Sequence, residues 1–422
     1  MSGSEHWRSS LSFSDRFTSV VKMQVSSLYA FLILPNSRSS AYVRSSSSLD
    51  STEARRKAKS AEDDIYKSAA SLAEYHQQCG AFTVELEDKG RSEGVGEQSE
   101  PSIDGDTTNE GGMTIGRYQN AAYYRNGVTS TVYRARSLSG HTGEESSRQA
   151  RTELVALKVM ELTALQPPHD AYREARVLRR AASSNVIPLV EAFQLAGSRL
   201  VLVFPFMYHD LPSLMSKGVA FSSNQRRNCL RDLFSALAHL HSLGIIHRDI
   251  KPSNILLHSP TGPAYLADFG IVWDPLDKAS EPADQKITDV GTTCYRPPEL
   301  LFGNTSYSFA LDMWAAGCVV AEVIDGSIES LFEAGDLGSE LALIRSIFKK
   351  LGTPTLETWP EAANMRDWGK MEFYNYPAQP WDTLLPGASS VGRDLVRKMV
   401  RYESVQRLSA AEALDHDFFH DR

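Results

Sequence analysis

One short stretch constrains the fold and chemistry of this chain more than any other. Residues 247–254 read HRDIKPSN and lie between two apolar segments, and residues 268–270, fourteen positions after Asn254, read DFG. An aspartate and an asparagine five residues apart can both act on one phosphoryl group, and a second aspartate can bind a magnesium ion that bridges nucleotide phosphates. The two motifs together therefore indicate phosphoryl-transfer chemistry.

Charged residues on both sides of these motifs fit the same chemistry. Upstream, residues 155–158 (VALK) end a strand-like run with a lysine that can neutralise phosphate charge, and Glu174 on the next expected helix is spaced to pair with Lys158. Downstream, residues 296–299 (RPPE) close a segment that we expect to shape a peptide site. Each motif alone is a weak signal, because a lone DFG is usually a turn and a lone strand lysine usually faces solvent.

In this order and at these separations the motifs match the signature set of protein kinases. The chain from about residue 115 to residue 420 thus resembles the eukaryotic protein kinase family. The resemblance implies an α+β, two-lobed fold, with a small antiparallel β-sheet lobe plus one helix at about 113–207 and a large, mainly α-helical lobe at about 208–420. The coarse pattern agrees, with strand-like runs over 118–136, 154–161, 186–194 and 199–206, and helical runs over 168–181, 224–243, 309–325, 338–351, 390–400 and 408–415.

The resemblance also implies roles for individual side chains. Asp249 would accept the proton of the attacking hydroxyl, and Lys251, the residue type typical of serine/threonine kinases at this position, would contact the transferred phosphate. ATP and Mg²⁺ are the implied cofactors, with Asn254 and Asp268 as the metal ligands. The expected catalytic set is Asp249, Lys251, Asn254, Lys158 and Glu174.

The glycine-rich loop departs from the family pattern of three glycines before a valine. Aligned on Val132, the three positions hold Arg125, Gly127 and Ser130, so one glycine is kept. A side chain at the last position hinders close approach of the backbone to phosphate, and we therefore expect a raised Michaelis constant for ATP rather than inactivity. The expected ATP-binding residues are Gly127, Ser130, Val132, Ala156, Lys158, Phe204, Pro205, Met207 and Asp210.

Several stretches are similar to the cyclin-dependent kinase (CDK) branch of the family. They are residues 202–207 (LVFPFM) at the expected hinge, residues 351–354 (LGTP) with the following Trp359-Pro360, and residues 410–419 (AAEALDHDFF). In this alignment Phe204 is the gatekeeper, and Asp210 lies near the ribose. Asp312 is the buried aspartate expected to hold the catalytic loop, and Arg407 is expected to pair with Glu299.

Three departures from that branch concern its activation. The cyclin-contacting helix of the branch reads PSTAIRE, whereas residues 168–174 read PHDAYRE. The activating threonine aligns with Ile287, which cannot be phosphorylated, and Thr288 is the fallback acceptor. Of the three arginines that bind the activating phosphate, Arg173 and Arg248 are kept, but the third position is Trp273.

This combination resembles the single-subunit CDK-activating kinases of fungi. The resemblance implies a serine/threonine kinase that acts on proteins, with another CDK as the candidate substrate, and that functions as a monomer without an ordinary cyclin. Two alternatives stay open: a cyclin-driven CDK, and a non-catalytic scaffold with the kinase fold. Arg296 stands where proline-directed kinases place an arginine, and Gly291 replaces a residue of unusual backbone conformation, which would allow a preference for proline after the acceptor.

Residues 1–112 differ in composition from the rest of the chain. They are rich in serine and then acidic, and we expect a largely disordered extension with a helix over 53–78. Within it, residues 55–59 (RRKAK) read either as a nuclear import signal or, more simply, as a solvated helix start.

The totals exclude several other functions. A net charge of −8 provides no basic field for nucleic acid, and no apolar run approaches the roughly 18 residues of a membrane span. The four cysteines show no paired spacing. We therefore expect no nucleic-acid or membrane partner and an intracellular location, in the nucleus, the cytoplasm or both.

Overall fold

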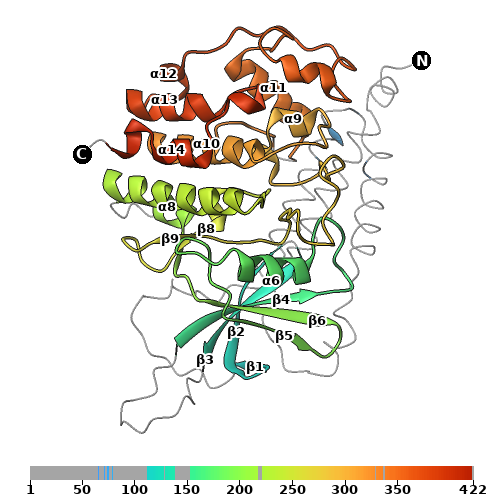
Figure 1. Cartoon of the computed structure of the whole chain (residues 1–422), viewed down its shortest axis with the longest axis vertical. Helices are drawn as coiled ribbons and strands as arrows, with labels where there is room; N and C mark the ends of the chain where they lie inside the picture. The colour runs from blue at the N-terminus through green and yellow to red at the C-terminus, as the bar shows by residue number, and fades with distance from the viewer. Residues whose placement is uncertain are drawn as a thin grey trace. The chain divides into compact units, whose positions relative to one another are not determined.

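The computed structural model describes residues 65, 71, 74, 75, 78, 112–127, 129–137, 153–216, 221–327, 329–335 and 338–420 (Figure 1). The serine-rich residues 1–50 and the acidic stretch up to residue 111 lie outside these ranges, as does most of the helix expected over 53–78. The chain divides into two units, Met1–Thr107 and Thr108–Arg422. The second unit contains the motifs and is described below.

The first part of this unit is an antiparallel sheet of six strands with the order β1-β2-β3-β4-β6-β5 (Figure 1). The side chains of β4 alternate between its two faces, because successive residues of a strand point in opposite directions. Val155 and Leu157 are buried in an apolar cluster with Val201, whereas Lys158 faces a cavity on the other side. The strands are β1 (Met113–Ile115), β2 (Tyr118–Asn126), β3 (Ser130–Ser137), β4 (Glu153–Glu161), β5 (Glu191–Leu195) and β6 (Arg199–Pro205).

One expected strand is shorter than its sequence pattern. The run 186–194 is strand only from Glu191. The preceding residues form isolated backbone hydrogen bonds, from Ile187 N to Leu266 O and from Val190 N to Val203 O. Pro188 lies between them and has no N–H group to donate to a ladder. The strand prediction over 186–190 is therefore wrong.

Helix α6 (Ala171–Arg180) accompanies the sheet and carries Glu174. The helix begins after Asp170, whose side chain accepts a hydrogen bond from Arg173 N at 2.9 Å. A capping carboxylate of this kind satisfies one of the unpaired N–H groups of the first turn. The start of the helix fixes its rotation about its own axis. This rotation buries Glu174 on the face of the helix that meets Lys158.

The second part is mainly helical, as the family resemblance implies (Figure 1). Helix α10 is apolar on all sides and lies in the centre of the core, which is typical of a fully buried helix. Short elements without a sequence signal accompany the long helices, among them a sheet of three two- or three-residue strands. The elements are β7 (His209–Asp210), α7 (Leu211–Ser216), α8 (Ser223–Ser242), β8 (Ile255–Leu257), β9 (Ala264–Leu266), α9 (Pro298–Leu301), α10 (Ala310–Asp325), α11 (Glu340–Leu351), α12 (Trp381–Leu384), α13 (Ser390–Met399) and α14 (Ala410–Leu414).

A buried ion pair joins the RPPE motif to the end of the domain. Arg407 donates to both carboxylate oxygens of Glu299, at 2.5 and 2.7 Å, and to the carbonyl of Ala310 at 2.9 Å. Both side chains are excluded from solvent. Because breaking a buried pair leaves an uncompensated charge, this contact fixes the segment that ends at Glu299 against α10. The pairing expected from the sequence is confirmed.

Across the described ranges, no helix combines the length and apolarity needed to cross a bilayer.

Candidate active site

The loop that carries the HRD motif is held by one buried carboxylate. Asp312, at the start of α10, accepts hydrogen bonds from the backbone N–H groups of His247 and Arg248, both at 2.9 Å, and contacts His241 Nε2 at 3.0 Å. Burial alone would raise the pKa of Asp312, but its bond to His241 and the neighbouring histidines hold that pKa below its ordinary value. Arg248 has a φ of 71°, a conformation that needs such support from its surroundings.

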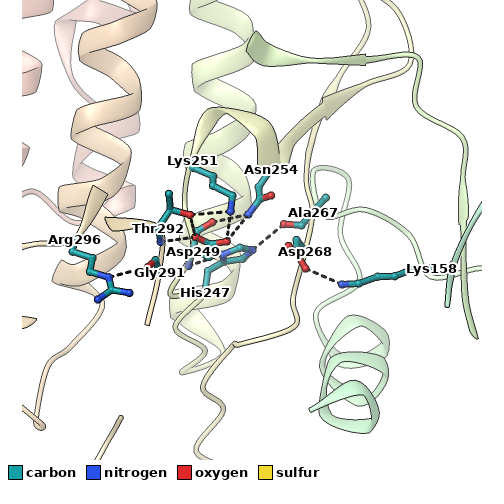
Figure 2. A network of polar contacts seen from close by, with 10 residues as sticks. All are labelled: Lys158, His247, Asp249, Lys251, Asn254, Ala267, Asp268, Gly291, Thr292 and Arg296. Atoms are coloured by element: carbon teal, nitrogen blue, oxygen red, sulfur yellow. Dashed lines mark hydrogen bonds and ion pairs between the residues drawn. The ribbon is translucent and has the colours of Figure 1, made fainter. Parts of the chain in front are cut away.

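Asp249 lies at the centre of a polar network (Figure 2). Its Oδ1 accepts hydrogen bonds from the backbone N–H of Thr292 at 3.0 Å and from the Thr292 hydroxyl at 2.9 Å. Its Oδ2 lies 2.8 Å from Lys251 Nζ, and Asn254 Nδ2 donates to the Asp249 carbonyl at 2.8 Å. Both carboxylate oxygens thus have fixed directions, which is what a group that orients a reacting hydroxyl requires.

Lys158 joins the small lobe to the DFG motif. Its ammonium lies 2.7 Å from a carboxylate oxygen of Glu174 and 2.8 Å from Oδ1 of Asp268, which Figure 2 shows facing the lysine. Burial would lower the pKa of Lys158, but the two carboxylates raise it well above its usual value. The charge of Lys158 in turn lowers the pKa of Asp268 far below its usual range, so both groups stay charged.

A cavity of about 310 Å³ lies between the sheet and the catalytic loop. All nine residues expected to bind ATP line it, from Gly127 on the β2–β3 hairpin to Asp210 in β7. Glu174, Lys251, Asn254 and Asp268 reach the same cavity. Asp249 lies next to it and lines a smaller hollow shared with Thr292, Gly291 and Arg296. This hollow has a volume of only about 10 Å³, and the residues of the cavity reach Asp249 through the hydrogen bond from Asn254.

The hairpin over the cavity keeps a tight turn despite its lost glycines. Gly127 N donates to Ser130 O at 2.7 Å, and a Cβ atom at Gly127 would lie 2.9 Å from Ser130 Oγ. Arg125, in place of the first glycine, comes within 3.9 Å of Asp210. Because both residues line the cavity, this ion pair lies at the end where the ribose is expected.

The segment after the DFG motif has the backbone conformation expected at Gly291. Gly291 has a φ of 76°, and a Cβ atom there would lie 2.6 Å from the Arg248 carbonyl oxygen. Its own carbonyl accepts a hydrogen bond from Arg296 Nε at 2.9 Å (Figure 2). The carbonyl is therefore turned toward Arg296.

Sequence reasoning missed several residues of the site. Thr292 bonds both to Asp249 and, through its hydroxyl, to Lys251 Nζ at 2.9 Å, yet it is 43 residues from Asp249 and belongs to no recognised spacing. Leu256 and Ala267 line the cavity and could have been inferred, because each stands within two residues of a metal-ligand candidate. Ile187 also lines the cavity, and it lies within residues 186–190, which were wrongly predicted as strand.

Two comparisons with known proteins agree with this geometry. A family model described as the protein kinase domain matches residues 139–419, which is well over half of the chain. The serine/threonine-protein kinase csk1 of Schizosaccharomyces pombe is 36% identical over 262 residues, which are 61% of this chain and 83% of that protein. The complete set of lysine, paired glutamate and two aspartates lies within the matched residues. The chain therefore belongs to the protein kinase family and is a serine/threonine protein kinase.

Proposed function

We propose that the chain transfers the γ-phosphoryl group of ATP to a protein hydroxyl through the network around Asp249 and Lys158. The observation that supports this proposal most strongly is that the contacts of Lys158 and those of Asp249 are formed in the same structure. Lys158 touches Glu174 and Asp268, while Asp249 is held by Thr292 and Lys251. Positioning and charge stabilisation supply most of the catalysis in phosphoryl transfer.

In this mechanism two lysines stabilise phosphate charge and one aspartate accepts a proton. Lys158 binds the nucleotide phosphates in the cavity, and Lys251, which lines the same cavity and contacts Asp249, neutralises charge on the transferred group. Asp249 accepts the proton of the attacking hydroxyl through Oδ2, the oxygen that does not bond to Thr292 and that Lys251 Nζ and Asn254 Nδ2 hold in place. The hydroxyl approaches Asp249 from the side of Gly291 and Arg296.

Asn254 and Asp268 fit a magnesium ion. Both line the cavity, both offer oxygen, and the low pKa of Asp268 keeps its carboxylate ionised. Asn254 donates its Nδ2 to Asp249 at 2.8 Å, so its amide oxygen is turned away from that residue. Among the described residues no cluster of three or more histidine, cysteine or acidic side chains forms a complete cage, and Mg²⁺ commonly uses one or two protein oxygens with substrate phosphates and water. When bound, the ion would neutralise charge on the phosphates.

We further propose that the substrate is another CDK and that no cyclin is needed. The support is the resemblance to fungal CDK-activating kinases, which combines a CDK-like hinge at 202–207 with an altered helix at 168–174 and with Ile287 at the activating position. Ile287 packs against an apolar cluster, and its carbonyl accepts a hydrogen bond from the Tyr307 hydroxyl at 2.7 Å. A phosphorylated side chain would not suit this apolar position.

The test is phosphate transfer from labelled ATP by the purified chain alone. The acceptors are an unphosphorylated monomeric CDK and a generic basic protein, and Asp249→Asn is the inactive control. We expect label on the activation loop of the CDK without added cyclin. Label on the generic protein alone would retain the kinase but contradict this substrate. Activity that appears only with a cyclin would favour the cyclin-driven alternative.

Changing Ile287, which aligns with the activating threonine, or Thr288, the fallback acceptor, should leave activity intact. In Ile287→Val and in Thr288→Val, we expect kcat to stay within about twofold of the unmodified chain, because neither side chain contacts the network. Ile287→Val should cost about 1 kcal/mol of unfolding free energy through lost packing. Initial rates and mass spectrometry of the purified chain check this. Phosphate at Thr288, together with a tenfold loss in Thr288→Val, would show that the loop must be phosphorylated.

A further inference from the structure

Three carboxylates are concentrated in residues 274–281 (DPLDKASE), which we call the acidic segment. It lies between Trp273, which stands where an arginine is expected, and the Ile287 position. The segment folds on itself, with Asp274 N donating to Ser280 Oγ at 3.2 Å. Its three carboxylates, at Asp274, Asp277 and Glu281, are thereby directed at other parts of the domain.

Two of these carboxylates bind helix α6. Arg176 donates to both oxygens of Asp277, at 2.6 and 2.9 Å, and Arg180 Nη2 lies 2.6 Å from Asp274 Oδ1. The two arginines are four residues apart and therefore share one face of the helix. Bidentate contacts between arginine and carboxylate fix geometry as well as charge. The acidic segment thus contacts the helix that carries Glu174.

The third carboxylate binds the catalytic loop. Arg248 donates to both oxygens of Glu281, at 3.1 and 3.0 Å, and the Arg248 side chain is fully buried. The Trp273 indole donates to the Glu281 carbonyl at 2.9 Å. Burial would raise the pKa of Glu281, but Arg248 lowers it below the ordinary value, so the carboxylate is ionised. A buried guanidinium needs an anion, and Glu281 supplies it.

The remaining arginine of the expected phosphate-binding set, Arg173, makes one contact with the acidic segment and one with the Pro168 carbonyl. Arg173 Nη1 donates to the Ala279 carbonyl at 3.2 Å. Arg173 and Arg248 are the two arginines that would bind an activating phosphate, and one segment of the chain contacts both. The third position is filled by Trp273, which binds the same segment through its indole N–H.

We propose that the acidic segment is an intramolecular activator, in which Glu281 takes the place of an activating phosphate on Arg248 while Asp274 and Asp277 hold α6 in the position that keeps Glu174 on Lys158. This inference rests on the proposed activity without cyclin or loop phosphate, and it assigns that activity to named positioning residues. The Lys–Glu pair must be in place for phosphoryl transfer by kinases, so a contact that fixes α6 acts on catalysis without touching ATP.

Hydrogen exchange tests the proposal without any substrate. Glu281→Gln removes the charge that pairs with buried Arg248 and should loosen the acidic segment, whose other two carboxylates hold α6. We therefore expect amide exchange in residues 171–180 to rise about tenfold. The matched control is Asp284→Asn, a change at an exposed carboxylate three residues further along. Unchanged exchange in Glu281→Gln would overturn the proposal, whatever the substrate is.

A charge exchange on α6 separates positioning from a general loss of structure. Arg176→Asp and Asp277→Arg should each lower kcat about tenfold, with the Michaelis constant for the protein acceptor unchanged, and the double variant should recover most of the loss. The side chain of Arg176 is 51% exposed but that of Asp277 only 5%, so the melting temperature of each variant is measured beside kcat, and recovery of both in the double variant excludes misfolding as the cause of the losses. Equal losses in the single and double variants would contradict a positioning role.

The outcomes also separate this inference from the proposed function. An unmodified chain that is active alone, with Glu281→Gln and Asp277→Arg equally active, would keep the cyclin-free kinase and overturn the activator. An unmodified chain that needs a cyclin would overturn both. Activity of the unmodified chain alone on a generic basic protein, with the expected losses in the variants, would support the activator even if no CDK is phosphorylated.

Discussion

Replacing Asp249 by asparagine is expected to lower kcat about 10³-fold, within the range of general-base contributions. Thr292 donates twice to Oδ1, so the oxygen of the new amide would remain there and its nitrogen would replace Oδ2. That nitrogen would then face Lys251 Nζ, which lies 2.8 Å from Oδ2, and two donors would meet. The amide also cannot take a proton from a hydroxyl. Steady-state transfer of labelled phosphate to a protein acceptor measures the effect.

The fold and the nucleotide affinity should survive this change. Asp249 does not line the nucleotide cavity, and the loop around it is held through Asp312 rather than through its own side chain. We therefore expect the melting temperature and the dissociation constant of ATP to match those of Asp284→Asn. More than a tenth of the original kcat in Asp249→Asn would exclude a role as the base.

Lys158→Ala is expected to reduce kcat/KM for ATP about 10³-fold, because it removes the cation that positions the phosphates. It also leaves Glu174 buried without its partner, and burial raises the pKa of Glu174, so that carboxyl group would become neutral. Asp268 would lose the charge that keeps its pKa low. Initial rates over a range of ATP concentrations measure the loss.

Lys349→Ala is the matched control for this prediction. Lys349 is an exposed lysine on α11, far along the chain from the cavity, and its removal should leave kcat/KM unchanged. Lys158→Arg keeps the charge but not the compact ammonium, and we expect it to recover only part of the loss. Full activity in Lys158→Ala would show that phosphate positioning does not depend on this lysine.

The part of the site that sequence predicts best is the part made of short spacings. Asp249, Lys251 and Asn254 lie within six residues, so their proximity follows from the chain itself. The contact of Lys158 with Glu174 spans 16 residues, and strand and helix periodicity still brings the two together. The two-lobed fold followed from the family resemblance, because its motifs fix the order of the elements.

The contacts that sequence did not predict join distant segments through irregular loops. Thr292 reaches Asp249 across 43 residues, and Glu281 reaches Arg248 across 33. No periodic pattern describes the path of such loops, because their backbones follow no repeating hydrogen-bond rule. The strand prediction over 186–190 was wrong for a local reason. It relied on the apolar composition of this stretch and gave too little weight to Pro188, which has no N–H group to donate.

The carboxylates on Arg248 and Arg176 are part of the polypeptide, and this has a consequence for control in the cell. A phosphatase can switch off an enzyme whose arginines bind a phosphate, but it cannot remove Glu281 or Asp277. An enzyme held active in this way has its output set by how much of it is made, by how quickly it is degraded and by which substrates reach it. The activity of such an enzyme then depends on its concentration and on its access to substrates, and not on its phosphorylation state.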